Sequence, residues 1–157
     1  MQRIPMTAYG KAKLVEELNL LKTVERPRIV KEIEEARAHG DLKENAEYHA
    51  AKDKQGHIEG RIRFLEDQLS RCEVIDTSRL GTEKVVFGVT VKLFDIDSDK
   101  ELQYRIVGDI ETDATKGHIS INSPIARALI GKQVGDVAIV QAPGGQRELE
   151  VVEITVI

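Results

Sequence analysis

The residues with the clearest chemical potential lie in the segment GDLKENAEYH, residues 40–49. This segment carries the carboxylates of Asp41 and Glu44, followed by that of Glu47. Residues three apart on a helix share a face, so Asp41 and Glu44 can reach one ion together. Carboxylate oxygens suit Mg²⁺, but this ion keeps several waters and takes further oxygens from a substrate or partner. The pair therefore indicates half of a metal site of the kind that two-metal phosphoryl chemistry requires, with a partner supplying the other half.

The same two carboxylates also have a structural interpretation, which their spacing alone favours. An aspartate at the N-cap with a glutamate three residues later is a capping-box arrangement. In that case Gly40 ends one helix in a left-handed conformation and Asp41 begins the next. Carboxylates also suit the positive end of the helix dipole. Capping and catalysis do not exclude each other, so both interpretations stay open for Asp41 and Glu44.

Long helical patterns over residues 9–38 and 47–73 must position this segment. Sustained heptads in the second pattern predict two helices packed as an antiparallel coiled-coil hairpin. At a rise of ~1.5 Å per residue, such a hairpin holds its end on the order of 40 Å from its base. The two heptad rows are Tyr48, Gln55, Ile62 and Leu69, and Ala51, Ile58, Leu65 and Cys72.

The first helix has a predicted start and a predicted irregularity. Thr7 is a suitable N-cap, and the apolar face begins with Leu14 and Leu18. Pro27 interrupts the pattern because it lacks a backbone N–H and its ring clashes with the preceding turn. We expect either a kink there, or a helix that ends near Glu25 and a new one that starts at Pro27.

From about residue 76 the apolar period changes from seven to two, which predicts a second domain. Ser123 and Pro124 begin a short helix that runs to Ile130, and Gly131 follows it as a cap. Pro-Gly-Gly at residues 143–145 predicts a hairpin turn. The fold class is therefore α+β, with a hairpin domain at 1–75 and an antiparallel sheet with one short helix at 76–157. The predicted strands are 85–91, 104–107, 118–121, 137–141 and 146–154.

Charge and composition limit the functions that are compatible with the chain. The net charge is −4, with 14 Lys/Arg against 14 Asp/Glu in residues 1–75 and 9 against 13 in residues 76–157. Neither half has the basic footprint of a protein that grips nucleic acid unaided, so such contact must be local and arranged by a partner. Arg37, Lys43 and Lys52 flank the carboxylates and can hold a phosphate backbone, although taken singly each fits a solvated helix residue better.

The single cysteine and the hydropathy pattern indicate in which cellular compartment the protein is expected. Cys72 has no second cysteine with which to form an internal disulfide, which favours the reducing cytoplasm. No apolar run approaches the ~18 residues of a membrane span, so we expect no membrane partner. The two helices of a hairpin bury each other's apolar stripes without a second chain, so we expect a monomer.

Three long motifs carry a specific resemblance. They are MQRIPMTAYGKAKLVEEL at the start, GDLKENAEYHAAK at the turn and ISINSPIARALIGK in the second half. With these motifs the chain resembles the bacterial Gre transcript-cleavage factors over essentially its whole length, the A-type more than the B-type. The resemblance implies a coiled coil that enters the secondary channel of RNA polymerase, and an FKBP-like C-terminal domain docked at its rim. It also implies stimulated cleavage of the backtracked 3′ transcript, which rescues arrested complexes.

The resemblance also implies roles for individual residues. Asp41 and Glu44 match the family's acidic pair, which helps to hold the second Mg²⁺, shared with the polymerase, and the attacking water. Arg37 and Lys52 match basic positions that face the RNA. Arginine is familiar where this chain has Lys52, and lysine lacks the planar bidentate fork, so its hold on the transcript is expected to be weaker. Asn122, Ser123 and Pro124 match a polymerase-docking segment, although a simple helix start explains them equally well.

Two other classes of function compete with an accessory factor. A free-standing prolyl isomerase needs clustered aromatics, and Phe87, Phe94 and Tyr104 are few and scattered; fold resemblance is also weak evidence for activity. A protein that only occupies the polymerase channel is the other alternative. The presence of both Asp41 and Glu44 favours cleavage stimulation over such a blocking role.

Overall fold

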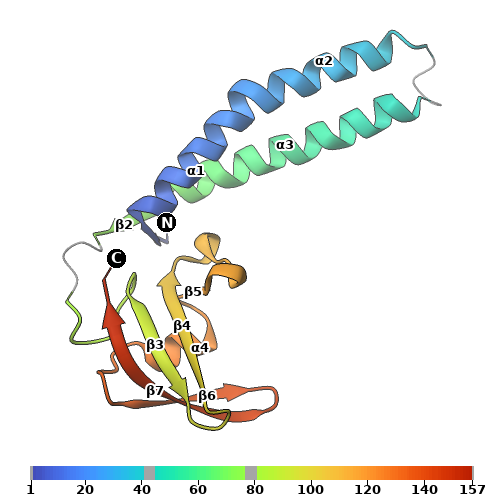
Figure 1. The fold of residues 1–157 in the computed structure, drawn as a ribbon. Helices are drawn as coiled ribbons and strands as arrows, with labels where there is room; N and C mark the ends of the chain where they lie inside the picture. The colour runs from blue at the N-terminus through green and yellow to red at the C-terminus, as the bar shows by residue number, and fades with distance from the viewer. Residues whose placement is uncertain (1, 41–44, 77–80, 157) are drawn as a thin grey trace. The chain divides into compact units, whose positions relative to one another are not determined.

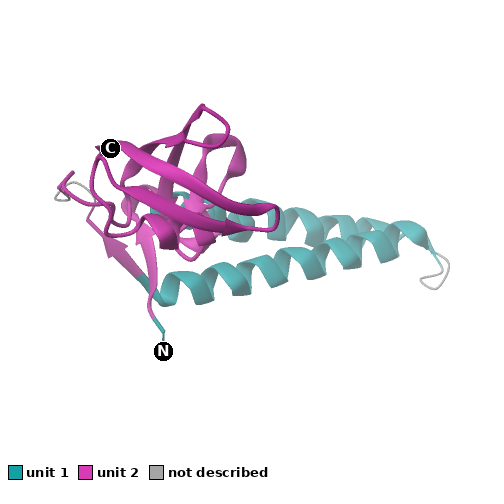
Figure 2. Cartoon of the chain, turned by 90° about the horizontal axis from the view of Figure 1, so that it is seen from below, with its two compact units in different colours: residues 1–2, 11–72 teal, residues 3–10, 73–157 magenta. Residues whose placement is uncertain are grey.

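The chain forms two compact units in the computed structural model, which describes residues 2–40, 45–76 and 81–156. One unit comprises residues 1–2 and 11–72, and the other comprises residues 3–10 and 73–157 (Figure 2). The transition after residue 72 lies near the predicted domain boundary at residue 75. Residues 3–10, which the sequence prediction assigned to the hairpin domain, group with the C-terminal unit instead.

The first unit is the predicted antiparallel helical hairpin, whose two arms run side by side (Figure 1). The first arm contains α1 (Ala8–Leu20), the π-helical segment η1 (Leu21–Glu25) and α2 (Arg26–Arg37). The second arm is α3 (Ala46–Ser70). Seven of the eight predicted heptad residues lie on α3, where four are buried and three are half-buried, so the heptad assignment is confirmed for these seven. The eighth, Cys72, does not belong to the helix as predicted, because α3 ends at Ser70 and Cys72 begins a strand. The buried cluster of the hairpin is Ile29, Ile33, Ala51, Ile58 and Ile62, with Leu18, Leu21 and Tyr48 packed against it.

The first arm passes Pro27 without leaving the helical conformation. The backbone N–H of Arg26 donates to the carbonyl of Leu21, five residues earlier, as in a π-helical turn. Both flanking residues keep right-handed helical dihedrals, with φ −62° and ψ −41° at Leu20 and φ −61° and ψ −51° at Arg26. The wider turn replaces the regular bonding pattern that a proline cannot complete. α2 therefore begins at Arg26, one residue before the predicted start, directly after η1.

Gly56 offers a stabilising substitution in the second arm. It lies inside α3, and a Cβ added there meets no atom within 4 Å. We expect Gly56→Ala to raise the free energy of unfolding by about 0.5–1 kcal/mol, because alanine loses less backbone entropy in a helix. Urea unfolding followed by circular dichroism measures this change.

Gly40→Ala is the matched control for that prediction. A Cβ at Gly40 also meets nothing within 4 Å, but its φ is +116°, a conformation that favours glycine. We therefore expect the control to lower the free energy of unfolding. If both alanine variants shifted stability in the same direction, backbone conformation would not explain either change.

The second unit contains a mixed sheet with one short helix, α4 (Pro124–Leu129). The strand order is β5-β4-β3-β7-β6, and β4 pairs in parallel with β5 while the other pairs are antiparallel. The prediction of a wholly antiparallel sheet is wrong for this one pair. Between β4 and β5 the chain forms two 3₁₀ turns, η3 (Asp109–Glu111) and η4 (Ala114–Lys116), and so re-enters the sheet in the same direction. The strands are β3 (Thr90–Asp95), β4 (Lys100–Val107), β5 (His118–Ser120), β6 (Val137–Ala142) and β7 (Gly145–Thr155), with a separate pair β1 (Ile4–Thr7) and β2 (Cys72–Ile75).

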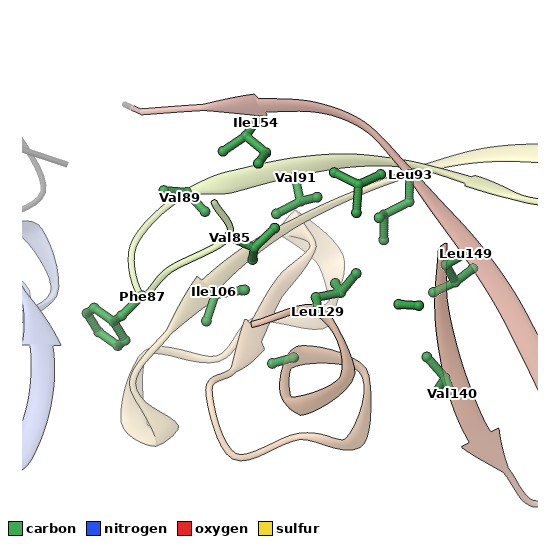
Figure 3. Packing of buried hydrophobic residues seen from close by; sticks show 13 residues of the cluster. Val85, Phe87, Val89, Val91, Leu93, Ile106, Leu129, Val140, Leu149 and Ile154 are labelled. Atoms are coloured by element: carbon green, nitrogen blue, oxygen red, sulfur yellow. The ribbon is translucent and has the colours of Figure 1, made fainter. Parts of the chain in front are cut away.

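The strand predicted at 85–91 is displaced toward the C-terminus. β3 begins only at Thr90, because Gly88 adopts φ +93° and Val89 donates its N–H to the carbonyl of Val86 in a turn. The alternating apolar residues before β3 are buried nevertheless, since they pack into the core as an irregular segment (Figure 3). In this segment the alternation of apolar residues indicates burial, but it does not indicate pairing in a sheet. The core of this unit includes Val85, Phe87, Val89, Val91, Leu93, Ile106, Leu129, Val140, Leu149 and Ile154.

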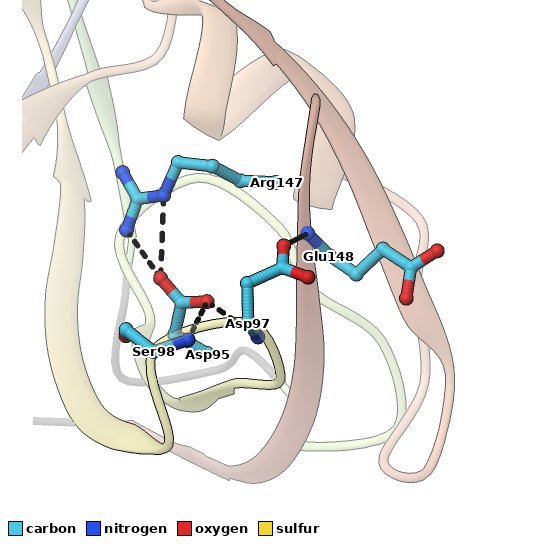
Figure 4. A network of polar contacts seen from close by, with 5 residues as sticks. All are labelled: Asp95, Asp97, Ser98, Arg147 and Glu148. Carbon is cyan, nitrogen blue, oxygen red and sulfur yellow. Dashed lines mark hydrogen bonds and ion pairs between the residues drawn. The ribbon is translucent and has the colours of Figure 1, made fainter. Parts of the chain in front are cut away.

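A buried carboxylate closes the loop between β3 and β4 (Figure 4). Asp95 is 4% exposed and accepts hydrogen bonds from Arg147 Nη2 at 3.0 Å and from the backbone N–H groups of Asp97 and Ser98 at 3.1 and 3.3 Å. The hydrogen bond from Arg147 holds the pKa of Asp95 below its usual range. Asp97 in turn accepts from the backbone N–H of Glu148 at 3.3 Å. This acidic sequence therefore ties one hairpin loop to β7.

A second carboxylate holds the start of α1. Glu111 accepts from the backbone N–H and the hydroxyl of Thr7, and from the backbone N–H of Gly108 at 2.9 Å. The Thr7 hydroxyl oxygen also accepts from the backbone N–H of Gly10 at 3.0 Å, which confirms the predicted N-cap. Residues 3–10 therefore belong with the C-terminal unit because a carboxylate of that unit binds their backbone and cap.

Candidate functional site at the end of the helical hairpin

The two predicted catalytic residues, Asp41 and Glu44, lie outside the described residues. The residues on both sides of them are described, and these form the ends of α2 and α3. Their arrangement determines which elements present the acidic segment and what surrounds it.

Asn45 joins the two arms at this end of the hairpin. Its side-chain oxygen accepts from the backbone N–H of Tyr48 at 3.0 Å, as an N-cap does, and its amide nitrogen donates to the carbonyl of Ala36 at 2.6 Å. Helix α3 begins at Ala46 and its N-cap is Asn45, whereas the predicted cap, Asp41, lies outside the described residues. Asn45 was not predicted as a cap from the sequence, although asparagine directly before a helical pattern is a strong N-cap signal.

The end of α2 matches the prediction more closely. Ala38 is the C-cap, and its N–H donates to the carbonyl of Glu34, while His39 donates to the carbonyl of Ala36 at 3.1 Å. Gly40 follows with φ +116°, which confirms a glycine with positive φ at the end of the helix. The carbonyl of Ala36 thus accepts from both His39 and Asn45, so one backbone group links the end of α2 to the start of α3.

The structure brings one of the predicted RNA-contacting residues onto an aromatic ring. The guanidinium carbon of Arg37 lies 5.8 Å from the centroid of the Tyr48 ring, within the range of a cation–π interaction. The Tyr48 ring meets the His49 ring edge-on, with centroids 5.5 Å apart. Lys52, the second predicted residue, is exposed one turn beyond Tyr48 and donates to Gln55 Oε1 at 3.1 Å.

An acidic groove lies along the hairpin near the same end. Its volume is about 530 Å³, and Glu32 pairs there with Lys54 at 3.9 Å. Glu35, which lines the groove, is two residues before Arg37 and therefore points about 200° away from it around the axis of α2. Arg37 and the glutamates of the groove therefore lie on opposite sides of the line along which the two helices pack. The groove is lined by Glu32, Glu35, Ala36, His39, Glu47, Ala50, Ala51 and Lys54.

Metal ligands and membrane spans can be assessed only for the residues that the structure describes. Among residues 2–40, 45–76 and 81–156, no group of three or more His, Cys, Asp or Glu side chains could hold a metal ion. Within the same ranges no helix combines the length and the apolar character needed to cross a bilayer. Asp41 and Glu44 supply hard oxygen donors of the type that Mg²⁺ prefers, but two carboxylates do not complete its coordination shell.

The predicted docking residues lie in the other compact unit. The Ser123 hydroxyl oxygen accepts from the backbone N–H of Ala126 at 3.2 Å, and Pro124 is in the first turn of α4, which confirms the helix-start interpretation. Asn122 is exposed and donates its side-chain amide to both oxygens of Asp109, at 3.1 and 3.2 Å. A fixed helix start with an exposed polar side chain is compatible with docking, which stays a prediction.

The aromatic residues considered for a prolyl isomerase pocket, Phe87, Phe94 and Tyr104, lie in the core and on strands of the sheet unit. Phe87 is only 8% exposed and belongs to the core of the sheet unit. Phe94 and Tyr104 are half-buried on neighbouring strands. A hollow of about 210 Å³ in this unit is lined by polar side chains, namely Thr90, Lys92, Gln103, Glu153 and Thr155.

Comparison with known families defines the class of this protein. Residues 4–74 match the family described as "Transcription elongation factor, N-terminal", and residues 80–156 match "Transcription elongation factor, GreA/GreB, C-term". The chain therefore belongs to the GreA/GreB family of transcription elongation factors.

Individual relatives cover almost the whole chain. Transcription elongation factor GreA of Alkalilimnicola ehrlichii is 59% identical over 155 residues, which is 98% of each chain. Transcription elongation factor GreA of Anaeromyxobacter sp. (strain K) is 58% identical over 151 residues, 96% of this chain and 91% of that protein. The crystal structure of GreA factor homolog 1 (Gfh1) of Thermus thermophilus is 31% identical, with coverage of 98% and 99% and a TM-score of 0.46. The predicted family resemblance is confirmed.

Proposed function

We propose that this chain stimulates the intrinsic endonuclease of bacterial RNA polymerase on backtracked transcripts. The helical hairpin enters the secondary channel of the polymerase and presents Asp41 and Glu44 at the catalytic centre. Cleavage releases a short 3′ fragment of the RNA and restores an aligned end, which rescues the arrested complex. The protein acts in the cytoplasm as a monomer and as an accessory factor, because the polymerase supplies the rest of the active site.

The N-cap of α3 is the observation that best supports this proposal. Asn45 caps the helix and also binds the carbonyl of Ala36, so the fold does not require Asp41 as a cap. The structural interpretation that competed for Asp41 and Glu44 depended on that cap. Capping of α3 therefore no longer competes with the proposed role of these two carboxylates.

The residues of the chain have separate roles in this proposal. Mg²⁺ held jointly with the polymerase would activate water and stabilise the leaving oxygen. Asp41 and Glu44 provide oxygen ligands and accept hydrogen bonds from the attacking water. Arg37 and Lys52 bind the RNA backbone, and both side chains are exposed. Asn122, Ser123 and Pro124 dock the sheet unit on the polymerase.

Transcript length in purified backtracked complexes tests the proposal. Polymerase stalled with an extruded 3′ end is incubated with Mg²⁺, with or without this protein, and labelled RNA is separated by size. We expect rapid shortening of the transcript with the protein, and renewed elongation when nucleotides are added. A protein that bound the polymerase but left the transcript intact would instead be a channel blocker, and the proposed function would be wrong.

A further inference from the structure

We propose that Tyr48 is a positioning residue that holds the guanidinium of Arg37 on the side of the hairpin along which RNA passes. This inference rests on the proposed function and adds a specific task for an aromatic residue at the end of α3. Tyr48 acts on the RNA through Arg37. It is the element that makes one flexible basic side chain a preorganised phosphate-binding group.

The ring is held firmly enough to act as a platform. Tyr48 is half-buried and packs against the apolar cluster of the hairpin. Its backbone N–H donates to Asn45 at 3.0 Å, which fixes the first turn of α3. The edge-on contact with His49 further restricts the ring.

Arg37 needs such a platform because it is exposed at the last turn of α2. A long side chain in solvent loses rotamer freedom when it binds a phosphate, and this loss weakens binding. The 5.8 Å contact with the ring of Tyr48 restricts the guanidinium before RNA arrives, and a cation–π contact does not use up the N–H donors that a phosphate needs. Arg37 and Tyr48 come from different arms, so the contact forms only when the hairpin is closed.

The acidic groove lies on the opposite side of the hairpin from Arg37, and this affects where a phosphate backbone can bind. The glutamates at 32, 35 and 47 line that groove and would repel a phosphate backbone. Arg37 lies about 200° from Glu35 around α2, so it is directed away from these carboxylates. Lys52 lies one turn from Tyr48 on α3, so the Tyr48 side carries both proposed RNA-binding cations. The groove and the two proposed RNA-binding cations therefore lie on opposite sides of the line along which the helices pack.

A double-mutant cycle between Tyr48 and Arg37 tests the proposal. Tyr48→Leu keeps an apolar side chain but removes the ring, whereas Tyr48→Phe and Tyr48→Trp keep a ring face for the guanidinium. We expect several-fold slower transcript cleavage at saturating factor for Tyr48→Leu, with wild-type rates for the two aromatic variants. Arg37→Ala should slow cleavage in the wild-type background but add little to Tyr48→Leu, because both changes remove the same interaction. The dependence of the cleavage rate on salt should weaken in parallel.

The proposal would be overturned if the substitutions at residues 37 and 48 acted on cleavage independently of each other. If Arg37→Ala slowed cleavage by the same factor with tyrosine or leucine at residue 48, the ring would not position the guanidinium. A loss in Tyr48→Phe or Tyr48→Trp equal to that in Tyr48→Leu would also contradict it, and these aromatic variants decide the matter if the leucine variant unfolds. Asp53→Asn, at an exposed position of α3 outside the groove, is the matched control and should cleave at the wild-type rate; a loss as large as that of Tyr48→Leu would show that the effect at residue 48 is not specific to the ring. Failure of the wild-type protein to shorten transcripts would reject the proposed function itself, which is a separate outcome.

Discussion

Replacing Asp41 by asparagine, or Glu44 by glutamine, is expected to abolish stimulated transcript cleavage while the protein still folds and binds the polymerase. Each substitution preserves size and removes one negative charge, and a neutral amide is a much poorer ligand for a hard cation such as Mg²⁺. Helix α3 retains Asn45 as its cap in both variants, so its stability should not depend on either carboxylate. Cleavage of labelled RNA in backtracked complexes measures activity, and competition with the wild-type protein measures binding.

A matched substitution separates the specific carboxylates from the general loss of charge. Asp53 is exposed on α3, beyond the proposed site, so Asp53→Asn removes the same charge elsewhere on the hairpin. We expect this control to cleave at the wild-type rate. Wild-type cleavage by both Asp41→Asn and Glu44→Gln would show that neither carboxylate takes part in the reaction.

Gly108→Ala is expected to cause a large loss of stability in the C-terminal unit. A Cβ at this position would lie 2.3 Å from the backbone oxygen of Pro5 and 3.1 Å from Glu111 Oε2. The backbone of β1 cannot move away without disturbing the Thr7 cap that Glu111 holds. Overpacking of this kind costs about 1–3 kcal/mol, and urea unfolding of the full chain measures it.

Gly144→Ala is the control within the same unit. A Cβ at Gly144, in the turn between β6 and β7, meets no atom within 4 Å. We expect a change in the free energy of unfolding of less than about 0.5 kcal/mol, as for other surface positions. Equal losses in the two alanine variants would mean that contact with Pro5 does not explain the sensitivity of Gly108.

Features that depend on neighbouring residues were predictable from the sequence. The heptads of residues 48–72 predicted the hairpin, because a repeat of seven places apolar side chains along one stripe of a helix. Thr7 and Ser123 were recognised as N-caps because a side-chain oxygen reaches backbone N–H groups within one turn. Residues 143–145 predicted the turn between β6 and β7 for a similar local reason.

The candidate site was predictable only in part. The acidic pair and the flanking cations are visible in the sequence, and the role of Asp41 and Glu44 stays a prediction. The contact of Arg37 with Tyr48 was not foreseen, since these residues lie on different arms and meet only when the arms pack. The N-cap of α3 was not predicted correctly, because Asn45 caps this helix and also binds the carbonyl of Ala36, nine residues earlier.

The sequence by itself determined the periodic helices, the caps at Thr7 and Ser123, the turn at residues 143–145 and the family, because each of these depends on residue types at short and regular spacing. The tertiary structure alone decided the parallel pairing of β4 with β5, the irregular segment before β3 and the contact of Arg37 with Tyr48 between the arms of the hairpin. Burial is common to strands and packed loops, so alternation at residues 85–89 could not distinguish them. Pairing partners and helix sides are set by contacts between distant residues, and those contacts exist only after the chain has folded.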